Sequence, residues 1–134
     1  MSTILFSGRF DRPHIGHIAT IGRLGIEYDK VIVVVLNYNK QTYAPEYRKQ
    51  ILEELLSMMK GEYEVVCHPT HFGKITAAMM RHEWDFDVYG SGNHDVLIHM
   101  AEIGVKSVYV ERAYDYSATD DRNIQKIKEV LNER

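Results

Sequence analysis

The longest apolar run of the chain, Val31–Leu36, constrains the fold more than any other segment. It reads Val-Ile-Val-Val-Val-Leu and lacks the polar–apolar alternation of a strand with one face in water. Together with Lys30 it predicts a strand buried on both faces, as in a parallel sheet covered by helices. The run is too short to span a bilayer, which takes about 20 apolar residues.

Strand-like and helix-like segments alternate along the rest of the chain. The other predicted strands are Thr3–Phe6, Glu64–Cys67, Asp87–Tyr89 and Lys106–Val110. Apolar residues at helical spacing predict a first helix from near Pro13 to Gly25, then Glu46–Lys60 before Gly61, Ile75–His82, Val96–Ile103 and a last helix from near Ser117. This order predicts an α/β protein with a five-stranded parallel sheet and helices on both faces, in a single domain over residues 1–134.

Ligands of parallel α/β sheets bind beyond the carboxyl ends of the strands, so the loops at that edge are candidate site segments. The loops after the first, second, fourth and fifth predicted strands share this edge. They are Arg9–His17, Asn37–Lys40, Gly90–Asn93 and Arg112–Arg122.

The first of these loops carries two histidines, His14 and His17, on a strand that turns through glycine into a helix. Such a turn can hold a phosphate, because backbone N–H groups and the positive helix end face the anion. The pair has three interpretations: structural or surface polar groups, zinc ligands, or phosphate donors. No Cys, Asp or Glu at matching spacing completes a zinc site, whereas Gly8 and Gly16 allow the close backbone approach of a phosphate.

Net charge and cysteine content limit the ligands and the cellular location that we expect for this protein. The net charge of −3 gives no general attraction for nucleic acid or an anionic membrane, so an anionic ligand must meet a local cluster of positive groups. Cys67 is the only cysteine, which excludes an intrachain disulfide and fits a reducing cytoplasmic location. The N-terminus shows no signal-peptide pattern.

Two segments together resemble a known superfamily. Gly8–His17, which reads G-R-F-D-R-P-H-I-G-H, resembles the signature of the HxGH nucleotidyltransferases. These include phosphopantetheine and nicotinamide mononucleotide adenylyltransferases and glycerol-3-phosphate cytidylyltransferase. Arg112–Thr119 resembles the late R-x-x-x-x-S-x-T segment of the cytidylyltransferases, and Ser117–Arg122 resembles the S-x-T-x-x-R of the nicotinamide enzymes. The resemblance implies their Rossmann-like fold.

Three further segments extend the resemblance. Asn37–Lys40 and Glu46–Arg48 resemble the N-x-x-K loop and the E-x-R of the phosphopantetheine enzymes. Asp87–Asn93 resembles the end of strand four in the nicotinamide enzymes, which contacts base and ribose. Two alternatives stay open: a plain solvated loop for Lys40, and a helix-capping turn with Asn93 as the cap.

The resemblance implies transfer of a nucleoside monophosphate from a triphosphate to a small phosphorylated acceptor, with release of pyrophosphate and with Mg²⁺ on the triphosphate. The implied catalytic residues are His14 and His17, as donors to the α and β phosphates, and Lys40. The implied nucleotide-binding residues are Ser7, Gly8, Arg9, Phe10, Gly16, Gly90, Gly92, Asn93, Arg112, Ser117, Thr119 and Arg122. The implied acceptor-binding residues are Asp11, Asn37, Arg48 and His71.

Subfamily signals are mixed. Arg9 is typical of the nicotinamide enzymes, and Asp11 of the phosphopantetheine and cytidylyl groups. Asp120 and Asp121 stand close to where phosphates would bind. Taken together, the resembling segments favour transfer of AMP. The alternative is cytidylyl transfer to a polyol phosphate such as glycerol 3-phosphate. The resemblance also allows a homo-oligomer, since related enzymes often form dimers or larger assemblies.

Other classes compete with an enzyme of this kind. A non-catalytic nucleotide sensor on the same fold is motivated by Asp121 and the mixed motifs. A second alternative is a fragment related to class I aminoacyl-tRNA synthetases, but this chain has no K-M-S-K-S-like segment. A third is a flavodoxin-like interaction domain, which would need no nucleotide. The remaining histidines need no functional role, and His94 and His99 are expected at the surface.

Overall fold

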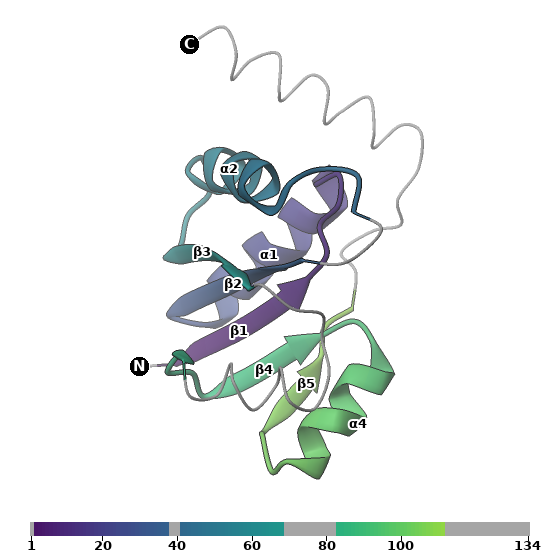
Figure 1. The fold of residues 1–134 in the computed structure, drawn as a ribbon. Coiled ribbons are helices and arrows are strands. Elements are labelled where there is room, and N and C mark those ends of the chain that lie inside the picture. Colours follow the sequence, from purple (N-terminus) through teal and green to yellow (C-terminus); the bar gives the residue numbers. More distant parts are fainter. Residues whose placement is uncertain (1, 38–40, 69–82, 112–134) are drawn as a thin grey trace, which may run out of the picture.

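A computed structural model describes residues 2–37, 41–68 and 83–111 of the chain. Its centre is a five-stranded sheet in the order β3-β2-β1-β4-β5, and every neighbouring pair is parallel (Figure 1). The strands are β1 (Thr3–Gly8), β2 (Lys30–Leu36), β3 (Tyr63–His68), β4 (Val88–Ser91) and β5 (Ser107–Tyr109). The predicted Rossmann-like α/β fold is therefore confirmed.

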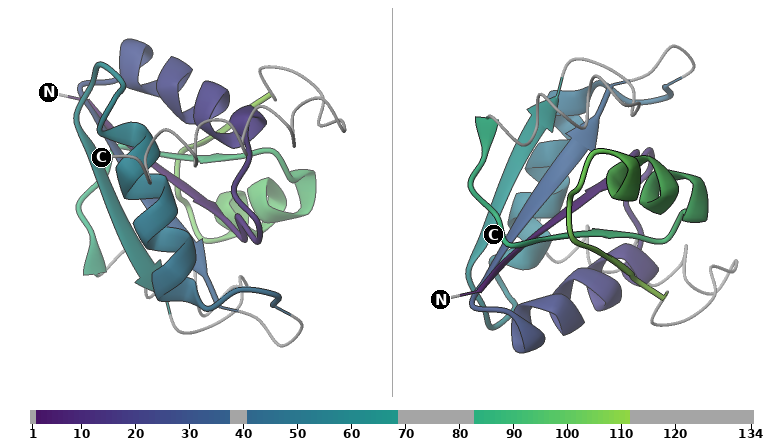
Figure 2. Two further views of the ribbon diagram at one scale, coloured as in Figure 1. Left: turned by 90° about the horizontal axis from the view of Figure 1, so that it is seen from above. Right: turned by 90° about the horizontal axis from the view of Figure 1, so that it is seen from below.

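Helices cover both faces of this sheet. α1 (Ile15–Glu27) and α2 (Pro45–Leu56) lie on one side, and α4 (His94–Glu102) lies on the other (Figures 1 and 2). Among the described residues, none of the helices has the length and apolar character needed to cross a membrane.

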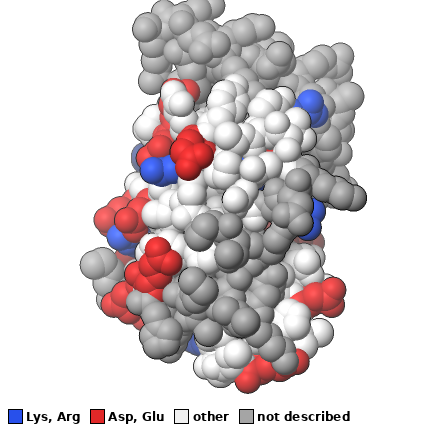
Figure 3. Space-filling view, in the orientation of Figure 1, with Lys and Arg blue, Asp and Glu red and all other residues white. Residues whose placement is uncertain are grey.

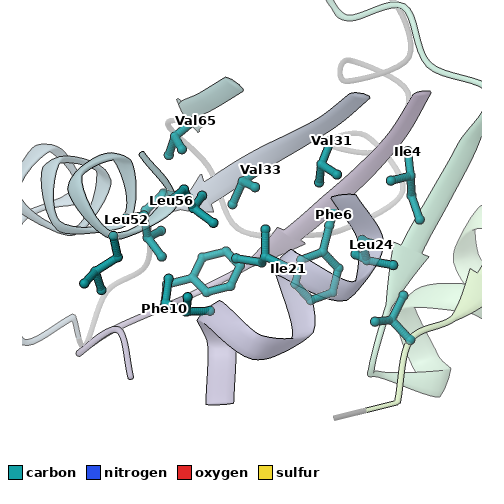
Figure 4. Close-up of a cluster of buried hydrophobic side chains, with 14 of the residues drawn as sticks. Ile4, Phe6, Phe10, Ile21, Leu24, Val31, Val33, Leu52, Leu56 and Val65 are labelled. Atoms are coloured by element: carbon teal, nitrogen blue, oxygen red, sulfur yellow. The ribbon is translucent and has the colours of Figure 1, made fainter. Parts of the chain in front are cut away.

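The strand β2 explains how one apolar run serves both layers. Its odd-numbered valines pack with α1 and α2, in a core that includes Ile21 and Leu52 (Figure 4). Ile32, Val34 and Leu36 pack on the opposite face in a second core, which includes Met100 of α4. Successive side chains of a strand point to opposite faces, so a strand between two layers must be apolar throughout.

Two predicted helix C-termini are wrong. α1 begins at Ile15, close to the predicted start near Pro13, but it continues through Gly25 to Glu27. Gly25 is a packing residue, because a Cβ there would lie only 2.1 Å from the Tyr63 hydroxyl oxygen. α2 ends at Leu56, ahead of the predicted Lys60–Gly61 boundary, and Ser57 caps it by donating its hydroxyl to the Glu54 carbonyl at 2.6 Å.

The region around β4 also differs from prediction. Gly90 and Ser91 belong to the strand instead of to a turn, and α4 starts at His94 instead of Val96. A Cβ on Gly90 would lie 2.8 Å from Val110 and 2.9 Å from Ile4, so close packing demands glycine there. The predicted helices over 75–82 and from 117 onward lie outside the described residues.

Candidate functional site

A cavity of about 1030 Å³ lies at the carboxyl ends of β1 and β4. The strand order reverses between these two strands. From β1 the chain adds β2 and β3 toward one edge of the sheet, and it then returns to add β4 and β5 on the other side of β1. A reversal of this kind separates the two connecting loops and leaves a crevice between them. The cavity is lined by Ser7, Gly8, Arg9, Phe10, Asp11, Arg12, His14, His17, Leu36, Thr42, Tyr43, Ser91, Asn93, Asp95, Val96 and His99.

The two histidines of the first loop form the start of α1. His14 is the N-cap residue, and its Nδ1 accepts a hydrogen bond from the Gly16 N–H at 3.1 Å. His17 reaches back, and its Nδ1 accepts from the His14 N–H at 3.2 Å. The two rings stack, with centroids 3.7 Å apart and planes 20° from parallel. This is a capping box, built from imidazoles instead of the usual hydroxyl and carboxylate.

The capping box determines the tautomer of the two rings. A neutral imidazole has one donor and one acceptor nitrogen, and both Nδ1 atoms act here as acceptors. Their partners therefore assign the proton of each neutral ring to Nε2. Both rings line the cavity at the positive end of the α1 dipole. His14 and His17 thus offer a pair of N–H donors suited to an anion.

Phe10 anchors the loop that leads to these histidines. Its backbone has φ +47°, a left-handed conformation that is rare for an aromatic residue, and Arg12 follows with φ +70°. The ring is only 4% exposed and packs edge-on against His17, with centroids 5.0 Å apart. It also fills the space over Gly8, where a Cβ would come within 2.9 Å of it. Burial of the ring offsets the backbone strain and holds the histidines in place.

The floor of the cavity is tied to the core through Ser7. Its hydroxyl forms a hydrogen bond with the hydroxyl of Tyr89, which is fully buried on β4. Burial of Tyr89 raises its pKa well above the ordinary range, and the Ser7 bond lowers it by less. Tyr89 therefore stays protonated and orients Ser7, the last side chain of β1 before the glycine turn.

On the α4 side, Asn93 is an N-cap residue as one of the two interpretations predicted. Its side-chain oxygen accepts from the Asp95 N–H at 2.9 Å, and its own N–H donates to Ser91 Oγ at 3.1 Å. His99 was expected at the surface but lies in the cavity wall. His94 is exposed and stacks on Tyr109, with centroids 4.6 Å apart.

The opposite rim is made by the loop before α2. Asp11 accepts hydrogen bonds from the N–H groups of Thr42 at 2.5 Å and Tyr43 at 2.9 Å. Both oxygens of the Asp11 carboxylate are used in this way. Asp11, predicted to bind the acceptor, thus joins the β1–α1 loop to the loop that precedes α2.

Several predicted site residues are placed away from the cavity lining. A Cβ on Gly90 would meet the Val110 side chain, and a Cβ on Gly92 would meet the Val110 carbonyl oxygen. The N–H of Gly16 donates to His14 Nδ1. Asn37 pairs its N–H with the His68 carbonyl at the end of β3. Arg48 is fully buried in α2 and donates to protein acceptors. The ligand contacts assigned to these residues stay predictions.

Other predicted site residues lie outside the described parts of the chain. They are Lys40, His71, Arg112, Ser117, Thr119 and Arg122.

Sequence reasoning also missed several lining residues. These are Arg12, Leu36, Thr42, Tyr43, Ser91, Asp95, Val96 and His99. Arg12, Leu36 and Ser91 adjoin predicted residues in the sequence, so including the neighbours of each predicted residue would have found these three. His99 had one signal, a position four residues after Asp95 on the same helical face.

The chemistry of the lining is mixed in charge. Arg9 and Arg12 supply cations, and Asp11 and Asp95 supply carboxylates. Within residues 2–37, 41–68 and 83–111, no group of three or more His, Cys, Asp or Glu side chains gathers as a metal site. On the face shown in Figure 3, basic and acidic side chains of the described residues are interspersed.

Comparison with known proteins gives a partial match. No family model matches the chain. The chain is 36% identical over 63 residues to a phosphopantetheine adenylyltransferase of Natranaerobius thermophilus. The aligned part covers 47% of this chain and 38% of that relative, so the chain spans less than half of the relative's length. The similarity supports the class of nucleotidyltransferases and no narrower assignment.

Proposed function

We propose that this protein transfers a nucleoside monophosphate, with AMP favoured, from a nucleoside triphosphate to a small phosphorylated acceptor. The observation that carries the proposal is the imidazole capping box. Two stacked imidazole rings, each with its Nδ1 accepting a backbone N–H, stand at a helix N-terminus in a cavity at the point where the strand order reverses. This arrangement suits adjacent phosphate groups of one ligand.

The proposed reaction needs no protein nucleophile. A phosphate oxygen of the acceptor attacks the α-phosphorus, a new phosphorus–oxygen bond forms, and the bond to the β-phosphate breaks to release pyrophosphate. The work of the protein is to position the two substrates and to stabilise the charge that develops. His14 and His17 would donate to the α and β phosphates, beside Arg9. The parts assigned to Lys40 and to Ser117, Thr119 and Arg122 stay predictions.

Mg²⁺ fits this proposal through oxygen ligands. It keeps several waters and binds through one or two carboxylates together with substrate phosphates. The two carboxylates of the described lining are Asp11 and Asp95. Because Asp11 already accepts two backbone hydrogen bonds, Asp95 is the better placed to hold a hydrated ion. When bound, the ion would offset charge on the triphosphate.

The choice of nucleotide rests on residues that resemble different relatives. Arg9, the Asn37–Lys40 loop and the similarity to an adenylyltransferase favour ATP. Arg112 with Ser117 supports the alternative, cytidylyl transfer to a polyol phosphate. A non-catalytic nucleotide sensor is the remaining alternative. In each case the proposed ligands are small phosphorylated molecules, with no nucleic acid or membrane as partner.

Pyrophosphate release tests the proposal. The wild-type protein is assayed with Mg²⁺, each of ATP, CTP, GTP and UTP, and a panel of phosphorylated acceptors. Turnover is expected with ATP, and His17→Ala should abolish it. His94→Ala is the matched control, since it removes an exposed histidine outside the cavity lining. Nucleotide binding without turnover for any pair would refute the enzyme and favour the sensor.

A thermal-shift screen with the same triphosphates identifies the base. Stabilisation grows with the ratio of ligand concentration to dissociation constant, so the preferred triphosphate should give the largest shift.

A further inference from the structure

Arg48 is the most deeply buried charged side chain of the described structure, with 0% exposure. Its Nε donates to the Tyr43 carbonyl at 3.0 Å, and one Nη donates to the Leu36 carbonyl at 3.0 Å. The same Nη donates to the Arg9 carbonyl, and the other donates to Gln41 Oε1 at 2.6 Å. One guanidinium thus meets four acceptors.

These acceptors come from segments that are distant in sequence but adjacent at the cavity. Arg9 follows β1, Leu36 ends β2, and Tyr43 lies in the loop before α2. All three line the cavity, whereas Arg48 does not belong to the described lining. The guanidinium therefore lies behind the wall and touches it from the protein side.

The wall is also tied from its front. Asp11 accepts hydrogen bonds from the N–H groups of Thr42 and Tyr43, and Arg48 donates a hydrogen bond to the Tyr43 carbonyl. Residues 41–43 are thereby held between an anion on one loop and a cation on α2. A loop with no helix or strand of its own gains a defined position from these two side chains.

We propose that Arg48 is a positioning residue, which sets the relative places of the Arg9 loop, the end of β2 and the Tyr43 loop around the ligand. The chemistry of arginine explains its presence here. Its planar guanidinium has several donors in a rigid fork and satisfies carbonyls in different directions. A lysine carries a single charged centre on a flexible stem and cannot match this geometry.

The first test uses amide hydrogen exchange of the full chain without ligand, so it does not depend on the proposed function. Arg48→Met should speed exchange at the Thr42 and Tyr43 amides about tenfold, because the loop loses one of its two anchors. Amides of Val31–Val35 in β2 should keep their wild-type rates. Lys49→Met is the matched control, since it removes the neighbouring cation of the same helix and should leave both regions unchanged.

Milder variants keep the test decisive if Arg48→Met does not fold. Arg48→Lys should give an intermediate acceleration at the two loop amides. Gln41→Leu removes only the 2.6 Å bond and should give a smaller one. Equal acceleration of loop and β2 amides would show a general loss of stability and overturn the proposal, and so would unchanged exchange in all variants.

The second test rests on the proposed function and separates positioning from direct contact. In the pyrophosphate assay, kcat/KM of Arg48→Met should fall about 10²-fold, with part of the loss restored in Arg48→Lys. Loss of ligand affinity with wild-type exchange of the ligand-free loop would mean that Arg48 binds substrate itself, which overturns the positioning role. If the wild type has no turnover, only the proposed function fails, and the exchange data still decide on Arg48.

Discussion

Replacing His14 by asparagine should separate the two tasks that the structure gives to this histidine. The Nδ1 of His14 caps α1 by accepting the Gly16 N–H at 3.1 Å, and its Nε2–H is the proposed phosphate donor. Asparagine is among the best N-cap residues, and its Oδ1 can accept the same hydrogen bond. Its N–H₂ group is bonded directly to Cγ, one bond closer to the backbone than the imidazole Nε2, so it places no donor where Nε2–H stands. His14→Ala, the comparison variant, loses both the cap and the donor.

The expected stabilities follow from the cap. Both variants lose the ring that stacks on His17, so this loss cancels when they are compared. The remaining difference is the cap hydrogen bond, worth about 1 kcal/mol. The free energy of unfolding of His14→Asn should therefore exceed that of His14→Ala by about 1 kcal/mol. This difference corresponds to about 4 °C in Tm for a chain of this length.

The expected activities follow from the donor, which both variants lack. Loss of one preorganised donor to a developing charge lowers the rate by ~10²–10³. Both variants should lose activity by this factor in the pyrophosphate assay, despite their different stabilities. The measurements are urea unfolding followed by circular dichroism, and kcat with saturating substrates.

Two results would refute this reasoning. Equal stability of His14→Asn and His14→Ala would mean that the His14 side chain does not cap α1. Near wild-type kcat in His14→Asn would mean that the imidazole Nε2–H is not used in the reaction.

Three further perturbations test other parts of the molecule. His17→Glu keeps an oxygen that can accept the N-cap N–H but has no N–H to donate, so Tm should stay near wild type while kcat falls by at least ~10²–10³-fold; loss of stability without loss of activity would contradict the assignment. Gly90→Ala should destabilise the protein by about 1–3 kcal/mol in urea unfolding, because its Cβ would meet Val110 and Ile4 within 3 Å, and an unchanged midpoint would argue against this tight packing. Tyr89 has a raised pKa from burial, so the unfolded state loses its phenol proton first and stability should fall as pH rises above about 10. Tyr89→Phe should make this fall shallower without removing it, because burial also raises the pKa values of Tyr63 and Cys67. Alkaline urea titrations of both proteins in parallel would show equal slopes if the reasoning were wrong.

Patterns that depend on neighbouring residues predicted the fold well. The unbroken run in β2 indicated a strand with two buried faces, and its valines do divide between two cores. The alternation of strands and helices indicated the parallel sheet. The element ends were less predictable, since Gly25 resembles a helix terminator but is a contact point for Tyr63.

The capping box shows a limit of local signals. The spacing of His14 and His17 placed them on one face of a helix start, as the structure confirms. Histidine is not among the residues that usually cap helices, so no residue preference indicated that both Nδ1 atoms would be taken by the backbone. The phosphate-donor role itself stays a prediction.

Sequence by itself determined the class of fold and the loop in which the candidate site begins, because strand and helix periods and the glycine turn are local properties. Only the tertiary structure decided which residues meet at the cavity. His99 lies in its wall, and Arg48, a predicted ligand contact, is fully buried outside its lining. The physical reason is the strand order, since the reversal between β1 and β4 brings together segments far apart in the chain, and no local pattern records those distances.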